Sequence, residues 1–331
     1  MKTKWVRWST IMLIISFVVG MMGNVPLVDA SSGPTFDFKE SEFDAPSKKG
    51  FKYWYNELLS NHTPHHNGYD FITEEGQSQV IKGKFQYGDF RKDLEREWVS
   101  IYTYALSDSD ASWQKIGRAK TNLDGRIRFE IPENQQLNTG VHLVKLWVEG
   151  DGTSANMYVY NLAEEAKTVV FDIDGTLTTD DFENVRSYLE ELCDGDYVPK
   201  MHKDANRVAQ YYAERGYTIV YLTARPYWLA HKSQQWLKDL GFPRGVIHTY
   251  DDRGLLVGDK TADYKEAYLH EIAAHGANIH YAYGNATTDI KAYRDFGLAG
   301  EQTYIIGPNA GDRGTTPIQS YTEHLKDLNE E

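Results

Sequence analysis

Residues 167–178, KTVVFDIDGTLT, join a short apolar run to a turn that carries two carboxylates. The run Lys167 to Phe171 is continuous and β-branched, which is typical of a strand buried on both faces of a parallel sheet. Asp172 and Asp174 follow it directly, and Gly175 lets the backbone turn sharply after them. Because sites in parallel sheets lie beyond the carboxyl ends of the strands, the stretch predicts an α/β domain with an acidic pair at its sheet edge.

The sequence on the C-terminal side alternates apolar strands with helical stretches. Strands are predicted at 218–222, 279–283 and 303–306, and helices near 202–215, 228–240, 261–275 and 287–296. Alternation of this kind indicates a doubly wound parallel α/β sheet. We assign this domain to residues 164–331. Only about 45 residues separate Asp174 from the second strand, which leaves no room for a large cap domain.

The region before this domain has a different period. Residues 79–163 contain short segments rich in β-branched and aromatic residues, separated by turn signals, which indicates an all-β sandwich domain. It contains no catalytic constellation, and we expect it to pack, present a ligand or bind a protein partner. Residues 31–78 are interpreted as a linker with a short helical segment.

Residues 1–30 have the pattern of a secretory signal peptide. A basic start precedes the apolar run at 11–22, and small residues follow at 28–30. We therefore expect export, ending in a secreted or periplasmic protein. The alternative is an uncleaved membrane anchor, although the run is shorter than the roughly 20 residues that a bilayer requires.

Composition narrows the classes of partner. The formal net charge is −13, which argues against nucleic acid because phosphate backbones require basic patches. The single cysteine, Cys193, rules out a disulfide within the chain.

The aspartate pair and three later groups of polar residues occur in an order that suits phosphoryl chemistry. After the aspartate pair come Thr223 and Arg225 near the second strand, Lys265 on a helix, and Asn285 with Asp289 after a later strand. Asp172 would attack phosphorus and Asp174 would act as general acid and base. The hydroxyl and the two cations would hold a phosphate, while the amide and carboxylate oxygens suit Mg2+.

This order resembles the haloacid dehalogenase superfamily. Its details are similar to the lipin-type domain shared by lipin phosphatidate phosphatases and membrane-associated phosphatidylinositol transfer proteins. The stretches that carry the resemblance are DIDGTLTTDD (172–181), VYLTARP (220–226), FPRGVIH (242–248), DYKEAYL (263–269), YGNATTDIKAYRDFGL (283–298) and QTYIIG (302–307). The resemblance implies Asp172 as nucleophile and Asp174 as acid/base, while the short spacing described above predicts a capless fold.

The expected function is an exported, Mg2+-dependent phosphomonoester hydrolase. Its favoured substrate is phosphatidate or a related lipid phosphate at a membrane surface. The phosphate is expected to contact Gly175, Thr176, Thr223, Ala224, Arg225 and Lys265, and the metal Asp172, Asp174, Asn285 and Asp289. Two alternatives remain open, a non-catalytic module that binds phosphatidate or another phospholipid and a phosphatase of soluble monoesters or phosphoproteins.

Two further groups have alternative interpretations. His62, His65 and His66, together with Asp70, suggest a zinc site, although their polar, turn-rich surroundings favour a solvated loop. The aromatic residues at 51–55 could reach a membrane interface, but packing against the β-domain is favoured.

Overall fold

The computed structural model describes residues 34–179, 198–252, 254, 256 and 258–330. The predicted signal peptide and Cys193 lie outside the described residues. Among the residues that are described, no helix is long and apolar enough to cross a membrane.

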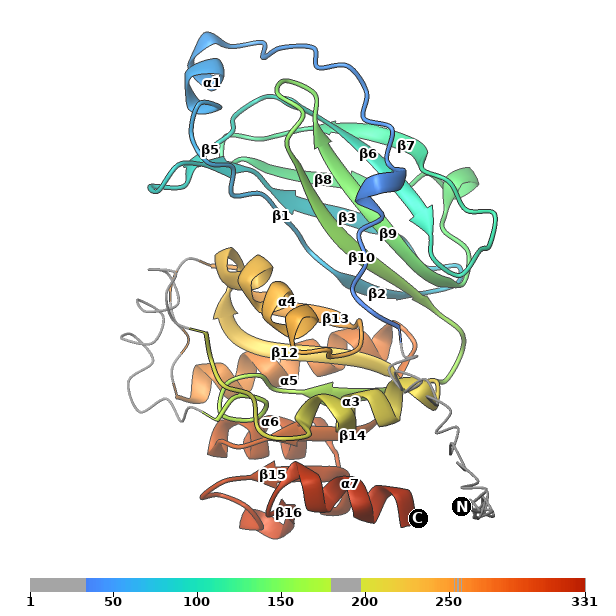
Figure 1. Cartoon of the computed structure of the whole chain (residues 1–331), viewed down its shortest axis with the longest axis vertical. Helices are drawn as coiled ribbons and strands as arrows, with labels where there is room; N and C mark the ends of the chain where they lie inside the picture. Colours follow the sequence, from blue (N-terminus) through green and yellow to red (C-terminus); the bar gives the residue numbers. More distant parts are fainter. Residues whose placement is uncertain (1–33, 180–197, 253, 255, 257, 331) are drawn as a thin grey trace, which may run out of the picture. The chain divides into compact units, whose positions relative to one another are not determined.

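The first half of the described chain forms a β-sandwich (Figure 1). One sheet has five strands in the order β2 (Phe71–Glu74), β10 (Ser154–Leu162), β9 (Gly140–Val148), β6 (Trp98–Ala105) and β7 (Gln114–Lys120). The other has the order β1 (Asn67–Gly68), β3 (Val80–Lys84) and β8 (Arg126–Glu130), and β4 (Gln86–Tyr87) pairs with β5 (Lys92–Asp93). Helix α1 (Trp54–Leu59) precedes these strands.

Strand β10 is buried on both of its faces. Met157 and Val159 point into the core between the two sandwich sheets, while Tyr158 and Tyr160 belong to the core shared with the α/β domain. Because successive side chains of a strand point to opposite faces, one strand contributes to both cores.

The second half is an α/β domain with a six-stranded sheet. All five neighbouring pairs are parallel, in the order β13 (Val246–Tyr250), β12 (Thr218–Pro226), β11 (Ala166–Phe171), β14 (Ala277–Gly284), β15 (Thr303–Ile306) and β16 (Thr316–Ile318). Helices α3 (Ala205–Glu214), α4 (Ala230–Asp239) and α7 (Tyr321–Glu330) cover one face, and α5 (Asp259–Ala274) and α6 (Thr287–Phe296) cover the other (Figure 1). The predicted fold class, a doubly wound parallel sheet preceded by a β-sandwich, is confirmed.

The strand order reverses between β11 and β14. Successive strands are added on one side as far as β13 and on the other side from β14 onward. Ligand sites of open α/β sheets form beyond the carboxyl ends of the strands at such a switch point. Asp172 follows β11 and Asn285 follows β14, so both lie at this position.

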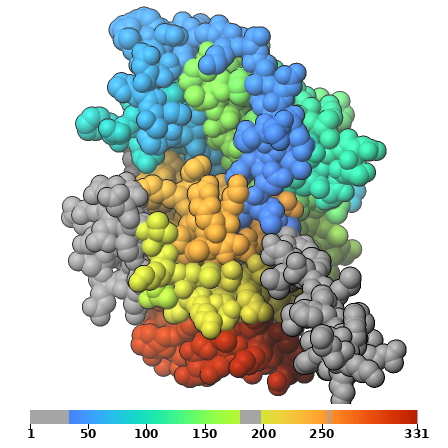
Figure 2. Space-filling model, in the orientation of Figure 1, coloured from blue at the N-terminus to red at the C-terminus, as the bar shows by residue number. Residues whose placement is uncertain are grey.

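The N-terminal segment differs from the predicted linker. Phe36 is buried and contacts the ring of Tyr158 in the sandwich and that of Tyr221 in the α/β domain. Glu40 forms an ion pair with the buried Lys145, in which Oε1 and Nζ lie 2.7 Å apart. Figure 2 shows this segment, in blue, lying along one face of the sandwich toward the α/β domain. Residues 34–43 therefore belong to the packed structure.

Candidate phosphate-binding site

A buried ion-pair cluster occupies the switch point. The Lys265 ammonium, from α5, donates to Asp172 Oδ1 and to Asp289 Oδ1, both at 2.6 Å. Lys265 is 3% exposed and Asp172 4%, so the cluster is shielded from water. The turn after β11 and the helices α5 and α6 supply these three side chains.

The turn after Asp172 connects the cluster to the next strand. The Thr176 hydroxyl lies 2.8 Å from Asp172 Oδ2 and 3.2 Å from Asn285 Oδ1. Gly175 adopts a φ of +75°, and an added Cβ would lie 2.1 Å from Asn285 Nδ2. Its own N–H donates to the Thr178 hydroxyl at 2.9 Å. The glycine is therefore required both by the backbone conformation and by the close approach of Asn285.

Asp289 also caps helix α6. Its Oδ2 accepts the backbone N–H groups of Asn285 and Ala286, at 3.1 and 3.0 Å. A carboxylate in the first turn of a helix satisfies backbone donors and interacts favourably with the helix dipole. Its two oxygens thus position both the β14–α6 turn and the Lys265 ammonium.

Burial and charge shift the pKa values of this cluster. Burial raises the pKa of Asp172 to about 7, because Lys265 opposes this only in part while Asp289 and Asp174 add negative charge nearby. Burial lowers the pKa of Lys265, but the two carboxylates outweigh burial and raise it above its ordinary value. One ammonium therefore serves two carboxylates in a buried site.

Asp174 is held by a second, separate group. The Arg225 guanidinium donates through Nε at 3.0 Å and through its NH2 nitrogen at 2.6 Å, and the Thr223 hydroxyl donates at 3.1 Å. Another Arg225 nitrogen donates to Ser233 on α4 at 2.9 Å. Charge-assisted bonds from a guanidinium fork fix a carboxylate firmly.

The structure thus forms two neighbouring clusters from the predicted site residues. Asp172, Thr176, Lys265, Asn285 and Asp289 form the first, and Asp174, Thr223 and Arg225 form the second. Ala224 lies between two members of the second cluster. The phosphate contacts expected of these residues remain predictions.

Two residues at this site carry no signal in the sequence. Ser233 anchors Arg225, and the Tyr321 hydroxyl on α7 donates to the Thr176 carbonyl at 3.1 Å. Ser233 lies eight residues after Arg225 on helix α4, whereas Tyr321 is distant in the sequence and is brought in by helix α7.

The donor set suits the chemistry of Mg2+. Asp172, Asn285 and Asp289 carry the carboxylate and amide oxygens that this ion prefers. Within the described residues, however, no group of three or more His, Cys, Asp or Glu side chains is close enough to hold a metal. The three oxygen-bearing side chains are linked through Lys265 and Thr176, so Mg2+ remains a prediction.

The histidine segment has a structural explanation at one position. His66 is hydrogen-bonded to the Thr153 hydroxyl at 2.8 Å and accepts the Gln86 N–H at 3.3 Å. Its ring packs against Phe85 and Tyr87, and burial lowers its pKa to about 3. His66 is thus a neutral core histidine.

Two segments of the chain match domain models that are both described as PITM 1-3 domains. Residues 64–160 match the beta-sandwich domain of PITM 1-3, and residues 169–307 match the LNS2 domain of PITM 1-3. The chain is a β-sandwich domain followed by an LNS2 domain. The clusters described above therefore belong to the LNS2 domain.

Several similar curated proteins are named as membrane-associated phosphatidylinositol transfer proteins. Protein retinal degeneration B of Drosophila melanogaster is 28% identical over 95% of this chain. Membrane-associated phosphatidylinositol transfer proteins 1 and 2 of Homo sapiens are 31% and 29% identical over 81% and 95% of it. The chain spans 24%, 20% and 22% of the lengths of these three relatives.

The solved structures that match this chain are too dissimilar to support a statement about its fold or function. A β-glucosidase from Listeria innocua matches with a TM-score of 0.18 and 10% identity, covering 31% of this chain and 16% of that one. A likeness of this size informs neither the fold nor the function.

The predicted phosphatase activity is wrong, while export and the Mg2+ requirement stay predictions. These relatives are named as phosphatidylinositol transfer proteins and not as hydrolases, so the assignment of the chain as a phosphatase is contradicted. The aspartate pair was the reason for that assignment, but Asp172 is engaged by Lys265 and Thr176, and Asp174 is engaged by Arg225 and Thr223. The alternative of a non-catalytic phospholipid-binding module agrees better with these findings.

Proposed function

We propose that this chain is a phospholipid-binding module whose LNS2 domain recognises the phosphate monoester of phosphatidate, or of a related lipid, without hydrolysing it. The observation that carries the proposal is the buried Asp172–Lys265–Asp289 cluster at the switch point, beside the Asp174–Arg225 pair. The names of the relatives support a lipid ligand.

The donors for a phosphate come from both clusters. An ammonium group has three N–H donors, and two of those on Lys265 are used by carboxylates. The third is left for a phosphate oxygen. Thr223 and Thr176 each carry one hydroxyl donor, which points to Asp174 and to Asp172 respectively and would turn to a phosphate oxygen when the headgroup binds.

The same contacts disfavour turnover. A nucleophilic carboxylate must reach phosphorus, and a general acid must reach the leaving oxygen. Both Asp172 oxygens accept hydrogen bonds from neighbouring side chains, and Asp174 accepts a guanidinium fork. Such carboxylates organise the cations that bind the headgroup.

Vesicle sedimentation tests the proposal. The full chain is expected to sediment with phosphatidylcholine vesicles that contain phosphatidate and to stay in solution with phosphatidylcholine alone. Lys265→Met and Thr223→Val are expected to weaken this binding about tenfold, because each removes a donor to the charged headgroup. Lys326→Met removes an exposed lysine on α7 and serves as the control.

Two results would contradict the proposal. One is equal binding to both kinds of vesicle, and the other is steady release of inorganic phosphate from phosphatidate by the unmodified chain. Circular dichroism of each variant separates loss of binding from loss of folding.

We also propose that Mg2+ strengthens headgroup binding through Asp172, Asn285 and Asp289. The divalent cation would supply positive charge between these oxygens and a phosphate. Chelation with EDTA is expected to weaken vesicle binding, and added Mg2+ to restore it. Asn285→Ala should lose this response, while Asn278→Ala, near the opposite end of β14, should keep it. Vesicle binding that ignores EDTA in the unmodified chain would refute the metal contribution.

A further inference from the structure

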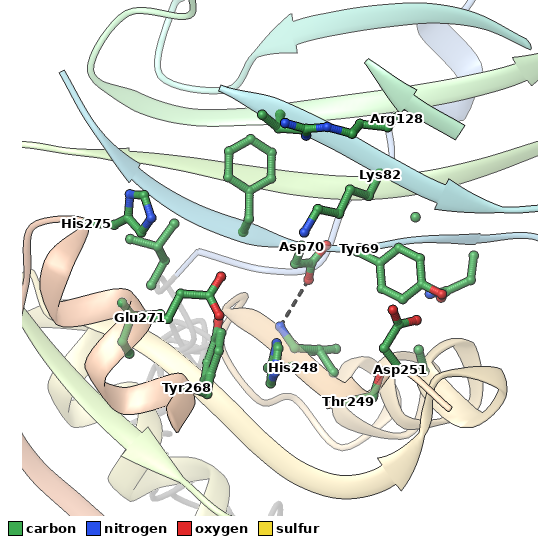
Figure 3. Close-up of a pocket in the computed structure, with 18 of the residues that line it drawn as sticks. Tyr69, Asp70, Lys82, Arg128, His248, Thr249, Asp251, Tyr268, Glu271 and His275 are labelled. Atoms are coloured by element: carbon green, nitrogen blue, oxygen red, sulfur yellow. Dashed lines mark hydrogen bonds between the residues drawn. The ribbon is translucent and has the colours of Figure 1, made fainter. Parts of the chain in front are cut away.

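A cavity lies between the sandwich and the LNS2 domain, away from the switch point (Figure 3). Its volume is about 370 Å³, which is within the range of small-molecule sites. Its lining comes from the segment around β1 and β2 and from β3 and β8 on the sandwich side. Strand β13 and helix α5 line the LNS2 side.

The sandwich wall presents two adjacent cations. Lys82 on β3 and Arg128 on β8 are directly opposed in the antiparallel pair and both line the cavity. In the part of the chain that the structure describes, neither forms an ion pair. In Figure 3 the Lys82 amine points into the space between the two domains. Because opposed like charges destabilise a sheet, this pair favours an anion that they share.

The LNS2 wall presents a buried donor. Tyr268 is 4% exposed, and its hydroxyl has no hydrogen-bond partner among the described residues. Its ring stacks on His248 with a centroid distance of 3.4 Å, which fixes its position. Burial raises the pKa of Tyr268 well above its ordinary value, so the hydroxyl keeps its proton. A buried hydroxyl without a partner is costly, and an acceptor oxygen in the cavity would satisfy it.

Most acceptors of the lining are already engaged. Asp70 accepts the N–H groups of Tyr158 and Ile247, and Asp251 accepts the Arg126 guanidinium. Glu271 is the carboxylate of the lining for which no such contact is described, and it is exposed on α5. A buried amide nitrogen, Asn67 Nδ2, adds a further donor without an acceptor. The unmet groups of this cavity are therefore mainly donors.

We propose that this interdomain cavity binds a small phosphate monoester, with its oxygens held by Lys82, Arg128 and the Tyr268 hydroxyl. Donors from two walls require an anion with several acceptor oxygens, as a phosphate has. The volume accommodates an organic substituent as well. Glu271 at the rim would accept a hydroxyl group of that substituent.

Hydrogen–deuterium exchange with calorimetry tests this site on the full chain. The probes are glycerol 3-phosphate, which represents a soluble ester, and phosphatidylcholine vesicles with phosphatidate, which represent a lipid headgroup. Binding is expected to protect β3, β8 and α5. The double variant Lys82→Ala/Arg128→Ala should lose at least about tenfold in affinity at this site, and Tyr268→Phe about threefold.

Lys120→Ala is the matched control because it removes an exposed sandwich lysine on β7. Protection by glycerol 3-phosphate alone identifies a soluble ester, and protection by phosphatidate vesicles alone identifies a headgroup. Protection of β3, β8 and α5 by neither probe overturns the proposal, as does unchanged affinity in the double variant. If the probes protect β3, β8 and α5 but give no protection at the LNS2 switch point, the result would count against the proposed function and not against this cavity.

Discussion

Gly175 shows how a single residue shapes the candidate phosphate-binding site. Its φ is +75°, and an added Cβ would meet Asn285 Nδ2 at 2.1 Å. Gly175→Ala is expected to cost about 1 kcal/mol for the left-handed backbone. It should cost more because Asn285 must move away from Thr176. Urea unfolding measures the loss of stability, and vesicle sedimentation measures the loss of binding.

Gly216 provides the control for this substitution. It has a similar φ of +80°, and nothing lies within 4 Å of its added Cβ. Gly216→Ala should therefore show the backbone cost without a change in vesicle binding. Equal effects of the two substitutions on both measurements would refute the role of the Asn285 contact.

Asp172 links the binding site to stability. Its pKa in the folded state is raised from 3.8 to about 7, so the folded protein holds a proton that the unfolded chain releases. Stability from this group is full below about pH 4 and is lost as the pH rises through 7. Asp172→Asn is expected to flatten this decline between pH 4 and pH 8, because the variant side chain carries no proton that titrates there. The measurement is urea unfolding from pH 4 to pH 8.

Asp263→Asn serves as the control for the pH profile, since it changes an exposed carboxylate on the same helix as Lys265. A variant profile parallel to that of the unmodified chain would rule out Asp172 as the source of the slope.

The sequence predicted which residues form the site better than it predicted which of them contact one another. The order of Asp172, Lys265 and Asp289 indicated that they would meet at one sheet edge, and they do. The pairing of Asp174 with Arg225 could not be inferred, because it depends on the path of β12 and on Ser233 of α4. Since the same residues serve catalysis or binding, the motif alone also favoured the wrong function.

At the scale of elements, prediction succeeded for helices and for interior strands of the α/β sheet. Helix 287–296 and strand 303–306 have the predicted bounds. The two edge strands, β13 and β16, were not predicted. β16 has three residues and contains Pro317, which is tolerated because an edge strand pairs on one side only. The sequence of so short a segment with a proline predicts a turn and not a strand.

Helix α7 is joined to the sheet by a buried hydrogen-bond chain. Tyr212 on α3 contacts the hydroxyl of Tyr283 on β14 at 2.8 Å, and His324 Nε2 on α7 contacts the same hydroxyl at 2.8 Å. Burial lowers the pKa of His324 to about 4. Because the unfolded chain binds this proton near pH 6.5, stability from His324 is lost as the pH falls from about 6.5 to 4.

His324→Phe is expected to reduce the acid-induced loss of stability and to cost about 1 kcal/mol at neutral pH through the missing hydrogen bond. Chemical unfolding at pH 7 and pH 5 measures both effects. His270→Phe changes an exposed histidine on α5 and is the control. An unchanged difference between the two pH values would show that His324 does not contribute to acid sensitivity.

At the scale of the whole described structure, polar contacts join the sandwich to the LNS2 domain. Arg126 binds Asp251 at 2.8 Å, and the Tyr227 hydroxyl donates to Gln86 Oε1 at 3.1 Å. These contacts pair residues more than a hundred positions apart, so sequence periodicity could not indicate them. The two predicted domains thus form one continuous packed unit in the described residues.

Asp70 is the contact that connects the two domains most directly. Its Oδ1 accepts the N–H of Tyr158 in β10 at 2.7 Å, and its Oδ2 accepts the N–H of Ile247 in β13 at 3.0 Å. Asp70→Asn replaces one acceptor with an amide donor, so one backbone N–H loses its partner. The expected cost is about 1–3 kcal/mol. In calorimetry, the single unfolding transition should broaden or separate into two.

Asp110→Asn is the control, because it changes a carboxylate in an exposed loop of the sandwich and should leave one sharp transition. If Asp70→Asn also leaves one transition at an unchanged temperature, other contacts hold the domains together and Asp70 is dispensable.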